Sequence, residues 1–120
     1  MLVKRITDCR EFEANDGSFV KELLHRKNED ISFGCSVAHA RVPAGGKTAP
    51  HVLGERAEAY IVLEGEGIVH VGEESEKVGR GNIVYIPAGK VQWVENTGDS
   101  ELVFLCIVDP AWSAEDDNRV

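Results

Sequence analysis

Short runs of apolar, β-branched residues alternate with glycine, proline, asparagine and aspartate along most of this 120-residue chain. From Ile31 onward these runs recur at intervals of roughly 8–12 residues, which is typical of an all-β sandwich or barrel. Eight short antiparallel strands within one domain predict a jelly-roll barrel. We expect these strands over residues 33–42, 50–53, 57–64, 66–72, 75–78, 83–86, 91–96 and 102–108.

The two ends of the chain have a different pattern. Residues 1–30 are predicted to form an N-terminal arm that packs on the barrel or on a partner subunit. Within this arm, the stretch from Ser18 to His25 fits either a short amphipathic turn or an edge strand. Residues 31–110 would form the barrel. Residues 111–120 form a polar tail, which Trp112 is expected to attach to the surface.

Composition narrows the choice of partners and compartment. The net charge is −8 and there is no basic cluster, so we expect neither nucleic acid nor an anionic membrane as a partner. No signal-peptide pattern and no long apolar run is present, which predicts a cytoplasmic protein. The three cysteines lack metal-site spacing and are expected to be reduced thiols. No motif predicts a nucleotide cofactor or a hydrolytic triad.

Two glycine-punctuated segments carry the candidate chemistry. Side chains two apart on a strand share a face, so His51 and position 53 would point together into the barrel. Glu58 begins the next strand, and Gln92 follows a Pro-Ala-Gly turn on a strand that can face both. The segments read GGKTAPHVLGERAEAYIVLEG (residues 45–65) and GNIVYIPAGKVQWVEN (residues 81–96).

These segments resemble the paired motifs of the cupin family. The first cupin motif is a glycine, five residues, His-x-His, three or four residues, a glutamate, six residues and a glycine. The second is a glycine, five residues, Pro-x-Gly, two residues, a histidine, three residues and an asparagine. Eight of the ten positions match in register. The two departures, Leu53 and Gln92, both fall on positions that hold metal-ligating histidines in the family.

The resemblance implies a double-stranded β-helix that holds a divalent metal ion, either Zn, Fe, Mn or Ni. Its ligands here would be His51, Glu58 and Gln92, with His39 of the preceding strand as a candidate fourth. The protein would then be a metal-dependent enzyme or metal-binding protein acting on a small polar molecule, such as a sugar, a sugar acid or a polyketide-like compound. Lewis-acid isomerisation or cyclisation is favoured over redox chemistry, because two imidazoles are missing.

A metal-free binding module for a sugar-like molecule is the alternative. Leu53 favours this interpretation, because an apolar side chain at a ligand position makes a better pocket wall than a metal site. The hydrogen bonds within an otherwise apolar wall would then come from His51, Glu58, Tyr60 and Gln92. A structural or regulatory role is a third interpretation. The sequence leaves open whether the protein is an enzyme.

Further positions complete the predicted site and its surroundings. The residues expected to line the pocket are Leu53, Tyr60, Phe104 and Cys106. Trp93 alternates with Gln92 and should point away from the pocket, which suggests a homodimer interface that also includes the N-terminal arm. His25 would reach a neighbouring pocket only if that arm crossed to another subunit.

Overall fold

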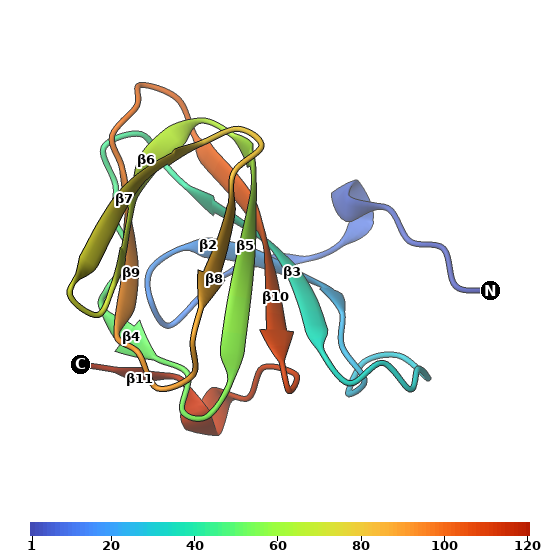
Figure 1. Cartoon of the computed structure of the whole chain (residues 1–120). Coiled ribbons are helices and arrows are strands. Elements are labelled where there is room, and N and C mark those ends of the chain that lie inside the picture. The colour runs from blue at the N-terminus through green and yellow to red at the C-terminus, as the bar shows by residue number, and fades with distance from the viewer.

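The computed structural model describes all residues from Met1 to Val120 and consists of two antiparallel sheets that face each other (Figure 1). The first sheet has six strands in the order β1-β2-β3-β10-β5-β8. Their bounds are Glu11–Glu13 (β1), Phe19–Leu24 (β2), Ser36–Val42 (β3), Leu102–Asp109 (β10), Ala57–Glu64 (β5) and Ile83–Ile86 (β8).

The second sheet has five strands in the order β11-β4-β9-β6-β7. Their bounds are Asn118–Arg119 (β11), His51–Val52 (β4), Gln92–Asn96 (β9), Glu66–Val71 (β6) and Glu74–Gly79 (β7). The predicted all-β double-stranded β-helix is confirmed, and each of the eight predicted strands is present with ends shifted by a few residues. The two helices are 3₁₀ turns of three residues (η1, Ile6–Asp8; η2, Ala114–Asp116), and neither could cross a membrane.

The core and the candidate site share the same strands because side chains alternate between the two faces of a sheet. On β5, Glu58, Tyr60 and Val62 are buried in alternation. On β9, Gln92 and Val94 follow the same rule. The buried hydrophobic core consists of Ala40, Val42, Tyr60, Val62, Val69, Val78, Ile86, Val94, Leu102 and Phe104. The polar residues therefore project from strands whose remaining inward side chains hold the two sheets together.

Both ends of the chain join the sheets. The stretch from Ser18 to His25 takes the strand alternative: β2 pairs with β3, and β1 forms an antiparallel hairpin with β2. At the other end, β11 pairs with β4, which places Arg119 opposite His51. The N-terminal hairpin and the C-terminal tail thus both come to the end of the barrel where β4 lies (Figure 1).

Asn96, the last residue of the second glycine-punctuated segment, stabilises the loop that follows β9. Its Nδ2 donates to the carbonyl oxygens of Val42 (2.9 Å) and Ser100 (2.8 Å), and its Oδ1 accepts from the backbone N–H of Gly98 (2.9 Å). Asn96→Ala leaves two carbonyls and one N–H without these partners. We expect a loss of about 2 kcal/mol in the free energy of unfolding, measured by urea denaturation.

The matched control for this variant is Asn118→Ala. Asn118 is exposed, and its side chain makes one bond, to the carbonyl oxygen of Glu115 at 3.5 Å. We expect the unfolding free energy of the control to stay within about 0.5 kcal/mol of wild type. Equal losses in the two variants would contradict the role given to Asn96.

Candidate functional site

A cavity of about 450 Å³ opens at the end of the barrel beneath the two chain ends. Its walls are the inward faces of β2, β3, β5 and β10, together with His51, the loop between β1 and β2, and the C-terminal tail. Thirteen of its 22 lining residues are hydrophobic. A largely apolar cavity of this size with a few converging polar groups is the usual form of a small-molecule site.

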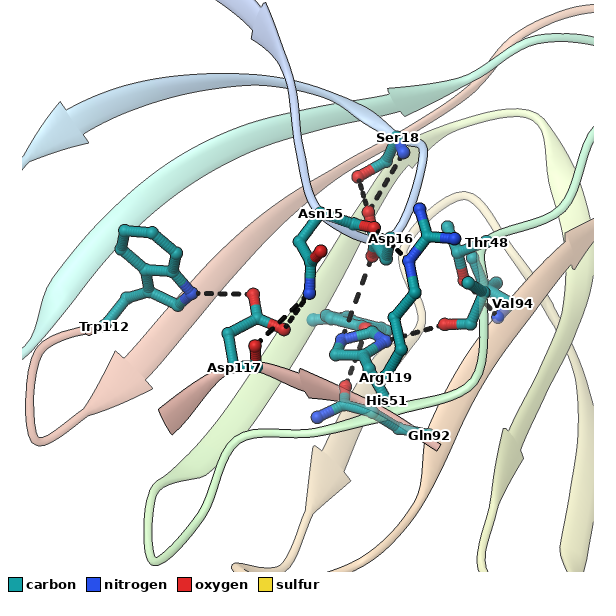
Figure 2. Close-up of polar contacts among 12 residues, drawn as sticks. Asn15, Asp16, Ser18, Thr48, His51, Gln92, Val94, Trp112, Asp117 and Arg119 are labelled. Carbon is teal, nitrogen blue, oxygen red and sulfur yellow. Dashed lines mark hydrogen bonds and ion pairs between the residues drawn. The ribbon is translucent and has the colours of Figure 1, made fainter. Parts of the chain in front are cut away.

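His51 is buried, and its ring is held in one orientation (Figure 2). Its Nδ1 lies 2.9 Å from the carbonyl oxygen of Ala49. A carbonyl can only accept, so Nδ1 carries the proton and donates it. In the neutral ring Nε2 is therefore an acceptor, and it faces Oδ2 of Asp16 at 3.8 Å without making a hydrogen bond. The imidazole thus presents an unused lone pair to the cavity.

Glu58 lies among buried polar side chains on the cavity wall. The Tyr60 hydroxyl donates to Oε1 of Gln92 at 2.9 Å. Gln92 and the Cys106 thiol favour the charged form of the neighbouring Glu58 carboxyl, but burial outweighs their effect on its pKa. Burial raises the pKa of Glu58 to about 8, and the nearby charge of Asp16 adds to this shift. Near neutral pH the carboxyl is accordingly protonated in most molecules.

Cys106 and Tyr60 are held in their neutral forms by the same surroundings. Burial raises the pKa of the Cys106 thiol well above its ordinary value, and the charge of Glu58 acts in the same direction. Burial likewise raises the pKa of the Tyr60 hydroxyl. The Tyr60 ring packs on Phe104 with a centroid separation of 4.6 Å. Since a thiolate is the reactive form of cysteine, this environment gives Cys106 a structural role in the wall.

The structure brings together most of the residues predicted from the sequence. His51, Leu53, Glu58, Tyr60, Phe104 and Cys106 all line the cavity. Gln92 is almost fully buried behind this wall, where it bonds to Tyr60. His39 is not brought to the site: its neighbours Ala38 and Ala40 line the cavity, whereas His39 alternates with them on β3. Its ring lies on the other face of the sheet.

The residues that the N-terminal hairpin and the C-terminal tail contribute to the site have no counterpart in the sequence prediction. Asp16 comes from the β1–β2 loop, and Trp112 and Asp117 come from the tail. The Trp112 indole N–H donates to Oδ2 of Asp117 at 3.0 Å, and the Asn15 amide donates to the Asp117 carbonyl oxygen at 3.2 Å (Figure 2). Asn-Asp-Gly-Ser at residues 15–18 is a typical hairpin-turn sequence and could have indicated the hairpin. No sequence signal places it over the cavity.

His25 and Trp93 are engaged within their own chain. His25 accepts from the backbone N–H of Lys27 through Nδ1 (3.1 Å) and donates from Nε2 to the carbonyl oxygen of Trp112 (2.8 Å). This buried ring therefore helps to hold the tail at the cavity. Trp93 does not line the cavity, and its ring stacks on His70 at a centroid distance of 3.8 Å. A homodimer remains a prediction.

Residues 38–108 match the cupin domain family, which covers more than half of the chain and includes both glycine-punctuated segments. This chain is a cupin. A protein of Methanocaldococcus jannaschii named MJ1618, whose own function is uncharacterized, is 36% identical over 107 residues, which are 89% of this cupin and 85% of that protein. Membership in this family is consistent with a divalent metal ion in the cavity and with an activity on small molecules.

Two further relatives carry names that refer to oxalate. The oxalate-binding protein of Thermotoga maritima is 27% identical over 88 residues, covering 73% of this cupin and 68% of that protein. The solved structure of a predicted oxalate decarboxylase from T. maritima superposes with a TM-score of 0.80 at 21% identity, covering 91% of this cupin and 99% of that chain. At this identity the superposition shows the shared fold.

Proposed function

We propose that this cupin binds a small polar organic molecule in its cavity without a bound metal ion. The cavity supports this function through its volume of about 450 Å³, its mostly hydrophobic walls and its converging polar groups. His51 offers an unused acceptor, and Glu58 offers a hydrogen-bond donor while it is protonated. The apolar walls would hold the body of the ligand, and the polar groups would fix its orientation.

The donor set does not fit the metal that the family suggests, and this observation carries the proposal. Leu53, buried on the cavity wall, occupies one family ligand position with a hydrocarbon. At another, the Oε1 of Gln92 already accepts from Tyr60. His51 and Glu58 remain, and no group of three or more His, Cys, Asp and Glu side chains is arranged to hold an ion. Protein metal sites usually need at least three protein ligands.

Restoring the two missing imidazoles tests this conclusion. We expect wild-type protein, incubated with Mn, Fe, Ni or Zn and then desalted, to retain far less than stoichiometric metal by inductively coupled plasma mass spectrometry. The double variant Leu53→His/Gln92→His completes the family ligand set and should retain about one ion per chain. A stoichiometric ion in wild-type protein that is lost in His51→Ala would overturn the metal-free interpretation.

Ligand-observed NMR tests binding itself. We expect small polar organic fragments to bind wild-type protein and to bind His51→Ala several-fold more weakly, because the variant removes the acceptor that faces the cavity. The matched control is His70→Ala, since His70 does not line the cavity and stacks on Trp93 instead. Equal fragment binding by wild type and His51→Ala would contradict the role given to this cavity.

A further inference from the structure

We propose that the ligand of this cavity is an organic cation, namely an amine with an apolar body. This inference rests on the proposed function and narrows it to one chemical class. The observation behind it is a one-sided lining: five carboxyl side chains, one of them the largely protonated Glu58, line the cavity, while no lysine or arginine does. The five are Glu13, Asp16, Glu22, Glu58 and Asp117.

Asp16 and His51 form the part of the cavity best suited to a cationic N–H group. Oδ1 of Asp16 is occupied, because it accepts from the backbone N–H of Ser18 (2.9 Å) and from its hydroxyl (2.6 Å). Oδ2 lies 3.8 Å from Nε2 of His51, which is within ion-pair distance but longer than a hydrogen bond (Figure 2). His51 is only 4% exposed, so its ring is buried at this end of the cavity. An ammonium group could donate to both atoms at once.

The other carboxyl groups strengthen the negative field. The charges of Asp16 and Asp117 both raise the pKa of the Glu58 carboxyl on the same cavity wall. Local cations neutralise few of these charges. Lys27 pairs with Glu22 at 3.0 Å on the outer part of the rim. Arg119 is exposed, is not part of the lining, and donates from Nε to the carbonyl oxygen of Asn15 at 2.6 Å.

The remaining walls favour a cation that carries hydrocarbon. Phe12, Tyr60, Phe104 and Trp112 give the cavity aromatic surface, to which organic cations bind well. A bare metal ion would gain little from such walls. An anion would meet several carboxylates and no lysine or arginine, so we expect no affinity for oxalate, to which the names of both T. maritima proteins refer.

Three probes with one carbon skeleton and different charge test this inference. Benzylamine, benzyl alcohol and benzoate are compared near pH 7 by ligand-observed NMR and calorimetry, with isobutylamine, isobutanol and isobutyrate as a second series. We expect each amine to bind at least about tenfold more tightly than its alcohol, and the carboxylates not to bind. Asp16→Asn should lower the affinity for the amines by about tenfold and leave that for the alcohols unchanged.

The matched control is Glu76→Gln, which removes the same charge from an exposed position of β7 outside the cavity and should leave all affinities unchanged. If alcohols bind as tightly as amines in both series, the cationic class is wrong and the proposed function stands. Tighter binding of the carboxylates would also overturn the inference. If none of the six probes binds wild-type protein, both the inference and the proposed function are contradicted. The wild-type comparison requires no variant to fold.

Discussion

The free energy of unfolding of Glu58→Gln is expected to exceed that of wild type at alkaline pH, and this difference should disappear as the pH is lowered. In the folded protein the pKa of Glu58 is raised from 4.5 to about 8, first by burial and then by the charge of Asp16. Between these two values the folded chain holds a proton that the unfolded chain releases. The wild type therefore loses stability as the pH rises from about 4.5 to about 8.

The expected size of this effect is large for a single carboxyl group. Each unit of pKa difference corresponds to about 1.4 kcal/mol, so the stability gap between variant and wild type should widen by roughly 3–5 kcal/mol between about pH 4.5 and about pH 9. Glutamine is neutral at every pH and can still accept a hydrogen bond from Gln92 or Cys106. Urea denaturation of both proteins across this range measures the gap.

Glu76→Gln is again the matched control, because Glu76 is exposed on β7. The stability gap between this control and wild type should change little with pH. A gap for Glu58→Gln that stays constant across the range would mean that Glu58 titrates normally. If the gap instead widened as the pH fell, the pKa of Glu58 would be lowered by folding, and the protonated state given to Glu58 would be wrong.

Gly67→Ala is expected to destabilise the fold by at least about 3 kcal/mol, which would lower Tm by more than about 10 °C. A Cβ at this position would lie 2.3 Å from the carbonyl oxygen of Glu95 on β9 and 2.9 Å from Cδ2 of Leu102 on β10. β6 is paired on both sides, with β7 and with β9. Its backbone can therefore move away from this contact only by disrupting hydrogen bonds on one side.

Gly34→Ala is the matched control for this prediction. A Cβ at Gly34 would meet nothing within 4 Å, and its φ lies outside the left-handed region. We expect its Tm to stay close to that of wild type. Similar losses in the two variants would mean that the close approach of β6 to β9 does not decide the stability of this region.

The departures from the cupin motifs have a common physical meaning at this site. Leu53 makes part of the wall apolar, and the buried Gln92 amide accepts a hydrogen bond from Tyr60. An amide accepts through its oxygen and donates through its nitrogen, and its neutral oxygen is a weaker metal ligand than an imidazole nitrogen. Leu53 therefore forms part of the apolar cavity wall, and Gln92 is a hydrogen-bonding partner of Tyr60, at positions that hold metal ligands in the family.

The sequence by itself determined the fold and most of the inward-facing residues. Strand alternation and turn residues are local properties, so the eight barrel strands and the shared face of His51 and Leu53 could be predicted from the order of residues alone. The same rule left His39 undecided, because its face depends on the register of β3 in the sheet. The tertiary structure resolved that register.

Only the tertiary structure decided the electrostatics of the cavity. Asp16 and Asp117 are about a hundred residues apart along the chain, and both line the cavity because β1 and β2 extend one sheet while β11 joins the other. Long-range pairing of this kind has no local signature. The raised pKa of Glu58 has the same origin, since it depends on burial and on a carboxylate contributed by a distant loop. The sequence therefore specified the barrel, and the packing of its two chain ends gave the cavity its charge.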